Sequence, residues 1–116
     1  MTRKIVELVL VSTIIICVLG VIRPTAAHET GLASIHDWRR EGGCICMSDH
    51  YHDGSGYGRT RHHAQLAAMR AWSDFTVFEY GSAWGHFGMA ASKKVRCTGG
   101  GQSWYCAVVA RPCKRG

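Results

Sequence analysis

Residues 61–80 read RHHAQLAAMRAWSDFTVFEY, and this stretch decides the fold because helix-forming residues carry an apolar repeat at helical spacing. The repeat consists of Ala64, Ala68, Ala71, Trp72, Phe75 and Phe78. Thr60 can cap the first turn by accepting a hydrogen bond from an early backbone N–H. Gly81 can end the helix, because glycine adopts the left-handed conformation without a Cβ clash. The sequence therefore predicts a long helix over residues 61–80.

A second, shorter helix is predicted over residues 83–91, with Ser82 as its cap. Its apolar stripe is formed by Trp84, Phe87 and Ala91. Gly85 and Gly88 weaken it by up to about 1 kcal/mol each relative to alanine. This helix therefore depends on packing for its stability.

The last segment has the alternation of a β-hairpin. Gly101-Gln102 suits a two-residue loop of the type that takes glycine first. The resulting register places all the alternating apolar side chains on one face, and a slip by one residue would expose them. The pairs that face each other in this register are Gly100 with Ser103, Cys97 with Cys106, and Val95 with Val108.

Five cysteines follow residue 27, and in an oxidising compartment so many in a short chain indicate disulfides. Cys97 and Cys106 face each other in the predicted hairpin and are the favoured pair. Cys113 is then left to bond with Cys44 or Cys46, an alternative that the spacing leaves open. The predicted fold class is a small, disulfide-stabilised α+β domain, with the long and short helices packed against the C-terminal hairpin.

Residues 1–27 have the pattern of a signal peptide. Arg3 and Lys4 precede an apolar stretch over residues 5–22, and small residues follow at 25–27, which predicts cleavage after Ala27. An uncleaved membrane anchor is the alternative, since roughly 18 apolar residues can span a bilayer. After cleavage, 11 basic and 7 acidic residues would remain, a net charge of +4 against +6 for the whole chain. We expect a secreted or periplasmic protein without a stable membrane span.

The predicted organisation is a signal peptide over 1–27, a loop-rich segment over 28–60 and a helix–helix–hairpin domain over 61–116. The middle segment is predicted to be loop-rich because of its cysteine, histidine and glycine content. These residues are concentrated in residues 44–60, CICMSDHYHDGSGYGRT. Alternating glycines favour turns over regular structure.

Residues 64–113 carry a family resemblance. The residues that carry it are Ala71-Trp72, Tyr80-Gly81, Trp84, Ala90, Lys93-Lys94, Cys97, Cys106 and Ala110-Arg111-Pro112-Cys113. This run resembles the C-terminal part of short exported bacterial proteins of unknown function that end in a similar Cys…Cys…Ala-Arg-Pro-Cys pattern. The resemblance implies export and a compact disulfide-bonded tail, and it implies no particular chemistry.

Two sets of residues are candidates for binding. Four histidines, His50, His52, His62 and His63, form the predicted metal site, because neutral imidazole suits zinc or copper. Three basic residues, Lys94, Arg96 and Arg111, fall on the outer face of the predicted hairpin together with Tyr105. Basic residues interleaved with an aromatic side chain are typical of surfaces that bind nucleic acid or acidic polysaccharide.

The 116 residues are too few for a two-domain enzyme, and the composition, 47% hydrophobic and 19% charged, is that of a globular chain. No nucleophile elbow or triad context surrounds the serines, aspartates and histidines. We therefore expect an exported, non-enzymatic binding module at the cell envelope. The alternatives are a periplasmic zinc- or copper-binding protein that uses the histidines and a cationic binder of anionic polymers.

Overall fold

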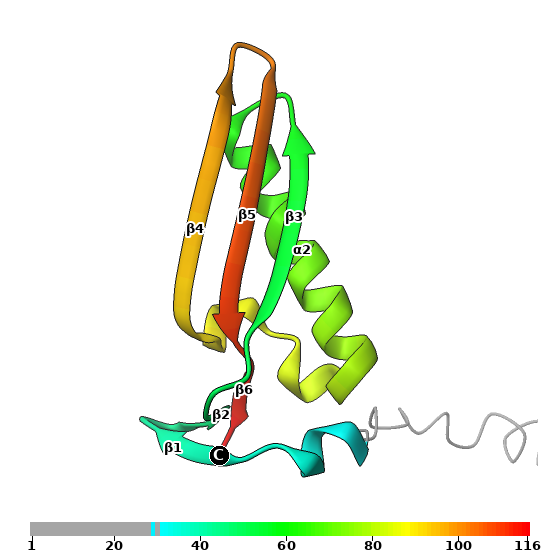
Figure 1. Ribbon diagram of the computed structural model, residues 1–116, viewed down its shortest axis with the longest axis vertical. Coiled ribbons are helices and arrows are strands. Elements are labelled where there is room, and N and C mark those ends of the chain that lie inside the picture. The colour runs from blue at the N-terminus through cyan, green and yellow to red at the C-terminus, as the bar shows by residue number, and fades with distance from the viewer. Residues whose placement is uncertain (1–28, 30) are drawn as a thin grey trace, which may run out of the picture.

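In the computed structural model, Glu29 and residues 31–116 are described, so the predicted signal peptide lies outside the described part. One long helix, α2 (Arg61–Tyr80), is accompanied by short 3₁₀ turns and by strands (Figure 1). The 3₁₀ turns are η1 (Gly31–Ile35), η2 (Ser82–Trp84) and η3 (Phe87–Met89). The strands are β1 (Trp38–Glu41), β2 (Cys44–Met47), β3 (His52–Gly58), β4 (Ala91–Gly100), β5 (Ser103–Arg111) and β6 (Cys113–Arg115).

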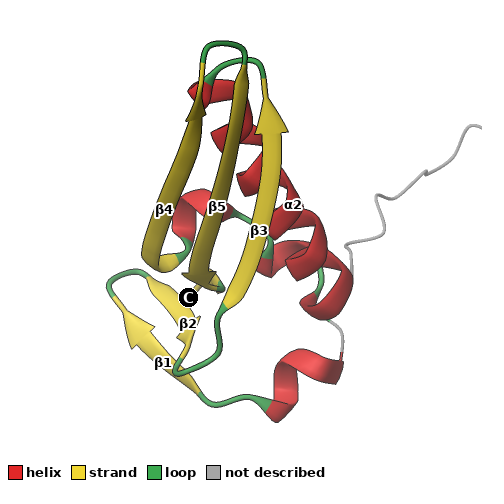
Figure 2. Ribbon diagram, turned by 45° about the horizontal axis from the view of Figure 1, so that its top comes forward, coloured by secondary structure: helices red, strands yellow, loops and turns green. Residues whose placement is uncertain are grey.

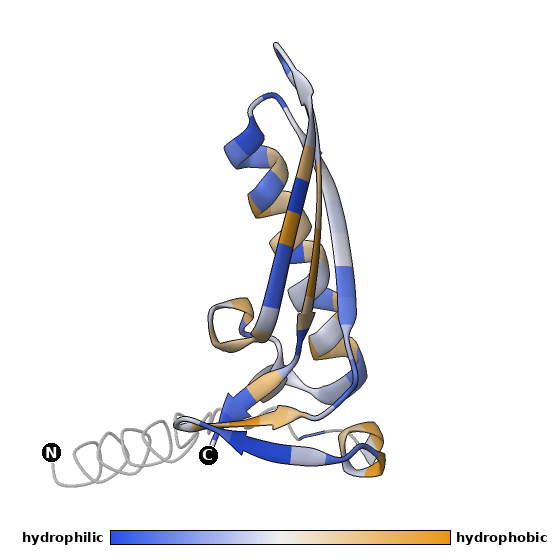
Figure 3. Ribbon diagram, turned by 60° about the vertical axis from the view of Figure 1, so that its left-hand side comes forward, coloured by the Kyte–Doolittle hydropathy of each residue, from blue (hydrophilic) through white to orange (hydrophobic). Residues whose placement is uncertain are grey.

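The strands form two antiparallel sheets, and the larger has the order β3-β5-β4. Helix α2 covers one face of this sheet, and the view in Figure 3 shows the resulting two layers. The smaller sheet, of order β1-β2-β6, lies at the end of the larger sheet where α2 finishes (Figure 2). The prediction of a small, disulfide-stabilised α+β fold is confirmed. Within the described residues, no helix combines the length and the apolar character needed to cross a bilayer.

Helix α2 begins and ends where the sequence predicts. The Thr60 hydroxyl accepts a hydrogen bond from the His63 backbone N–H, and the Gly81 N–H donates to the carbonyl of Val77. The buried face follows an i, i+4 repeat, and its members are Ala64, Ala68, Trp72, Thr76 and Tyr80. Phe75 and Phe78, which belong to the predicted apolar repeat, do not join this buried face, because Phe78 is 83% exposed and Phe75 48% exposed.

The expectation that residues 44–60 form a loop is also wrong, because β2 and β3 lie there. In β3, Gly54, Gly56 and Gly58 all face α2. A Cβ at Gly54 would lie 2.8 Å from Trp72 Cα, and one at Gly56 would lie 2.8 Å from the backbone nitrogen of Ala68. The glycines therefore allow the helix backbone to approach the sheet closely, which is a packing role rather than a flexible one.

The short helix predicted over 83–91 is absent, and the 3₁₀ turns η2 and η3 take its place. The weak helix propensity of Gly85 and Gly88 explains this outcome. Each glycine lowers helix stability, and the packing of this segment does not offset the loss. Trp84 is nevertheless fully buried, in a cluster with Ala33, Met47 and Tyr80.

The hairpin of β4 and β5 has the predicted register, with Val95 opposite Val108 and Cys97 opposite Cys106. Cys97 and Cys106 form a disulfide, as predicted. Cys46 bonds Cys113, which resolves the open alternative and leaves the Cys44 thiol unbonded. One disulfide thus closes the hairpin, and the other ties β2 to the C-terminal strand β6.

Candidate metal centre

A polar cluster fills the junction between the start of β3 and the last turn of α2. His52 is the first residue of β3 and is 2% exposed, and His50 precedes it by two residues. Glu79 comes from the last turn of α2. One ligand atom from each of these three residues lies within 4.8 Å of the other two. We call these three residues the His50–His52–Glu79 cluster.

The hydrogen bonds of His52 fix which of its ring nitrogens carries the proton. Thr76 Oγ1 donates to the carbonyl of Trp72 at 2.7 Å, so the hydroxyl has no second hydrogen to give. It must then accept from His52 Nδ1–H, which lies 2.8 Å away. In the neutral imidazole the lone pair is therefore on Nε2, the nitrogen that faces the other members of the cluster.

The atoms that converge at this point are electron-rich. His52 Nε2 lies 2.8 Å from Glu79 Oε2 and 3.1 Å from His50 Nε2. A lone pair and a carboxylate oxygen that face each other at this distance repel unless a cation or a shared proton lies between them. The arrangement of donors is therefore suited to holding a positive ion.

Burial favours the neutral form of both histidines. Desolvation lowers the pKa of His52 below its ordinary value, and the nearby Glu79 carboxylate opposes this effect only in part. Burial also lowers the pKa of His50, and the neighbouring His36 lowers it further. At neutral pH both imidazoles are thus unprotonated at one nitrogen, which is the state that binds a metal.

Aromatic rings and a buried phenol enclose the cluster. The Tyr80 ring stacks on His52 with centroids 4.9 Å apart, and the Phe75 ring lies 4.8 Å from His52. Burial and the Glu79 carboxylate raise the pKa of Tyr80 well above the ordinary value for a phenol. Tyr80 therefore remains a neutral hydrogen-bond donor beside Glu79.

The structure brings together only half of the predicted histidine set. His62 and His63 are exposed in the first turn of α2, and the helix rises about 25 Å between His62 and Glu79. These two residues therefore do not belong to the cluster that contains His50 and His52. Glu79 was missed by the sequence analysis, although it follows Trp72 by seven residues and so lies near the helix face that packs on β3.

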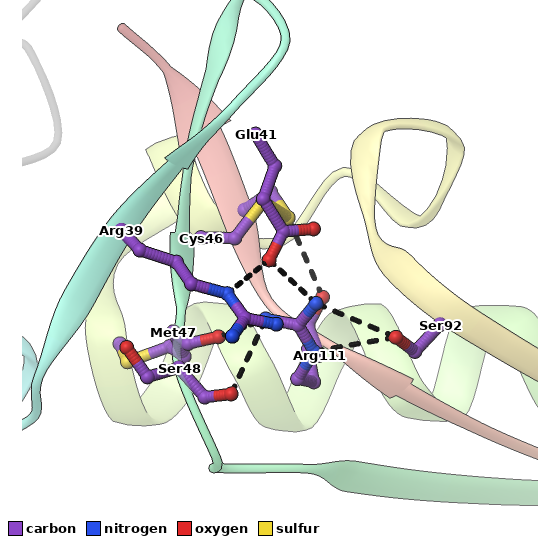
Figure 4. A network of polar contacts seen from close by, with 8 residues as sticks. Arg39, Glu41, Cys46, Met47, Ser48, Ser92 and Arg111 are labelled. Carbon is purple, nitrogen blue, oxygen red and sulfur yellow. Dashed lines mark hydrogen bonds and ion pairs between the residues drawn. A yellow bond between two sulfur atoms is a disulfide. The ribbon is translucent and has the colours of Figure 1, made fainter.

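Arg111 is not part of a polyanion-binding surface, contrary to the prediction, because it is 3% exposed. Figure 4 shows its guanidinium between the two sheets, where it donates to Glu41 Oε1 at 2.6 Å and to the carbonyl of Met47 at 2.5 Å. It also contacts the Ser92 hydroxyl at 3.3 Å. Arg111 is therefore a structural link between β5, the smaller sheet and the start of β4.

Lys94 and Arg96 remain exposed on the face of the larger sheet that α2 does not cover. They line a shallow groove together with Ala107 and Val109. Further along the same face lies an aromatic pair, Tyr57 and Tyr105, with ring centroids 5.0 Å apart. Two of the three predicted basic residues thus share an open surface.

Compared with known proteins, this chain matches no family model, no curated protein sequence and no solved structure. The resemblance of residues 64–113 to short exported proteins therefore stays a prediction.

Proposed function

We propose that this chain is an exported, non-enzymatic binding module that holds a zinc or copper ion through His50, His52 and Glu79. The observation that carries the proposal is the placement of His52, whose Nδ1 contacts Thr76 while its Nε2 faces both the Glu79 carboxylate and the His50 ring nitrogen. Two imidazole nitrogens and one carboxylate oxygen are a common donor set for zinc, and imidazole also suits copper. Thr76 acts as the outer partner that orients a ligating histidine.

Export is the second part of the proposal. Two disulfides are compatible with an oxidising compartment outside the cytoplasm, and residues 1–27 have the pattern of a cleavable leader. The intact mass of the protein recovered from its natural compartment tests both points. We expect a chain that begins at His28 and gains four hydrogens on reduction. A mass that includes residues 1–27 would contradict export by cleavage.

Metal binding is tested by metal analysis of protein purified without a chelator or an affinity tag. We expect one zinc or copper per chain and a rise in thermal stability when the metal is added to the stripped protein. His52→Ala should abolish both effects, whereas the double variant His62→Ala with His63→Ala should retain them. Sub-stoichiometric metal, with no change in thermal stability on addition of zinc or copper, would refute the proposal.

A second candidate function is binding of an anionic polymer on the open face of the larger sheet. The groove lined by Lys94, Arg96 and Ala107 favours this second function. The two basic side chains supply positive charge, and the small side chain of Ala107 leaves the bottom of the groove accessible. The exposed ring of Tyr57 adds a flat surface on which a sugar or a base can stack. This surface is separate from the His50–His52–Glu79 cluster in residues and in chemistry.

Heparin serves as the probe for this second function. Retention on immobilised heparin should fall steeply with salt, since polyanion binding releases counterions. Lys94→Glu with Arg96→Glu should reduce retention more than Arg61→Glu with Arg70→Glu, a control of equal charge change on α2. Equal losses from the two variants would mean that net charge, and not this groove, causes retention.

A further inference from the structure

Two adjoining cavities open along the 3₁₀ turns η2 and η3, where these turns pack on helix α2 and strand β6. The larger cavity has a volume of about 470 Å³ and the smaller one about 190 Å³. Both are lined by His86, Met89 and Arg115, so together they form one continuous groove, which we call the Arg115 groove. Its lining residues belong neither to the His50–His52–Glu79 cluster nor to the basic face of the larger sheet.

The wall of the groove that η3 forms is fixed by contacts within the chain. The Ala90 N–H donates to the carbonyl of Phe87 at 3.1 Å, and Lys93 Nζ donates to the carbonyl of Gly88 at 2.7 Å. The Phe87 ring packs edge-on against the buried ring of Trp72, with centroids 5.2 Å apart. A ligand would therefore meet a wall that is already ordered, which lowers the entropic cost of binding.

Positive charge lines the groove without a compensating acid. Arg115 is exposed and borders both cavities. No acidic side chain from the described residues lines either cavity. The arginine and lysine ion pairs of the described residues are made by other side chains, namely Arg39, Arg111 and Lys114. The Arg115 guanidinium thus keeps its paired N–H donors for an anion, and such a fork matches the two oxygens of a carboxylate.

The rest of the groove is largely apolar. Phe87 and Met89 line it, and the Met89 thioether is flexible and polarisable, so it can adapt to the shape of an apolar ligand. Gly88 borders the groove without filling it, because a Cβ there would meet nothing within 4 Å. The groove therefore offers a cationic group and an apolar wall to one ligand.

We propose that the Arg115 groove binds a small organic carboxylate that carries an apolar body. The Arg115 guanidinium pairs with the carboxylate, and the apolar body lies along Phe87 and Met89. The volume of the larger cavity falls within the range of about 300–1,000 Å³ that is usual for small-molecule sites. An inorganic anion would leave the apolar wall uncovered, and a neutral molecule would leave the charge of Arg115 unpaired. This inference does not depend on the proposed metal site.

The probe for this site is 3-phenylpropionate, followed by amide NMR shifts of the full chain. We expect saturable shifts at residues 85–89 and 115. Two matched compounds divide the probe into its parts, since 3-phenylpropanamide lacks the charge and acetate lacks the apolar body. Each should bind at least about tenfold more weakly, because a hydrogen bond to a charged group or a buried apolar group contributes that much. Equal binding of acetate, or no saturable shift at residues 85–89, would overturn the proposal.

Two variants test the residues. Arg115→Gln should weaken binding of 3-phenylpropionate by at least about tenfold, whereas Arg96→Gln, with the same change of charge on β4, should leave it unaltered. Gly88→Phe should fill the groove and abolish binding, and Gly100→Phe is its control, because a Cβ at either glycine meets nothing within 4 Å. Thermal unfolding shows whether each variant folds, and the exposed position of Arg115 keeps the test decisive if Gly88→Phe does not. Equal affinities of Arg115→Gln and Arg96→Gln would overturn the proposal.

Discussion

The two ends of helix α2 pack against the same strand, β3, with opposite chemistry. Near the start of the helix, the backbones of Ala64 and Ala68 lie directly against Gly58 and Gly56. Near its end, the partners of β3 are polar groups from the last two turns, which hydrogen-bond His52. At one end glycines let the two backbones approach closely, whereas at the other end the buried ring of His52 brings polar atoms that must find partners. One interface thus provides packing at one end and a binding site at the other.

Each end is also secured by its own disulfide, and removal of the bond that closes the longer loop should have the largest effect. The chain-entropy model assigns about 4 kcal/mol to Cys46–Cys113 and about 2.5 kcal/mol to Cys97–Cys106, because the loops span 67 and 9 residues. The double variant Cys46→Ala with Cys113→Ala should therefore be less stable than the double variant Cys97→Ala with Cys106→Ala by about 1.5 kcal/mol. Urea unfolding at equilibrium measures the difference. Equal losses would show that loop length does not determine these contributions.

Gly56→Ala should have the next largest effect, since it disrupts the close contact between β3 and the first half of α2. The new Cβ would lie 2.8 Å from the backbone nitrogen of Ala68, so the helix must move away from the sheet. We expect a loss of about 2–3 kcal/mol in the free energy of unfolding. The control is Gly100→Ala, where a Cβ meets nothing within 4 Å and the change should stay within about 0.5 kcal/mol. Comparable losses at the two glycines would refute the close-approach argument.

Thr76→Val should remove the hydrogen bond to His52 and destabilise the protein less than Gly56→Ala does. Valine keeps the shape but leaves His52 Nδ1–H without an acceptor, at a cost of about 1–2 kcal/mol. It should also weaken zinc binding by about 10- to 100-fold, because the hydroxyl no longer fixes the ligating nitrogen. Thr98→Val, at an exposed position of β4, should change neither quantity. Unaltered zinc affinity in Thr76→Val would contradict the assigned role of the hydroxyl.

The smallest expected effect on stability concerns Glu41, which accepts a hydrogen bond from Arg111 where the two sheets meet. Hydrogen bonds from Arg39 and Arg111 hold the pKa of Glu41 below its ordinary value of 4.5. The folded state therefore binds the proton less readily than the unfolded chain, so this contribution is present above pH 4.5 and is lost as the pH falls further. In Glu41→Gln the free energy of unfolding should depend less on pH below 4.5 than in the unaltered chain. Parallel pH profiles would show that Glu41 does not contribute.

The sequence predicted the parts of the fold that local pattern determines. Helix 61–80, its cap at Thr60 and the register that pairs Cys97 with Cys106 all follow from periodicity and turn chemistry, which act between near neighbours. Strand β3 was missed because its alternating glycines have low strand propensity, and only the helix packed against them explains their presence.

The candidate site was predictable only in part, for a related reason. His50 and His52 are two residues apart, so their shared direction could be inferred from the sequence. Glu79 reaches the same place through tertiary packing, which no local spacing reveals. His62 and His63 lie nearer to His52 along the chain than Glu79 does, but the direction of α2 carries them to its opposite end.

X-ray absorption at the zinc edge of the metal-loaded protein tests the central claim most directly. The account predicts only nitrogen and oxygen neighbours, at about 2.0–2.2 Å, with the outer scattering that imidazole rings produce. A sulfur neighbour at about 2.3 Å would place the metal on the Cys44 thiol instead. That result would contradict the assignment of the metal to His50, His52 and Glu79.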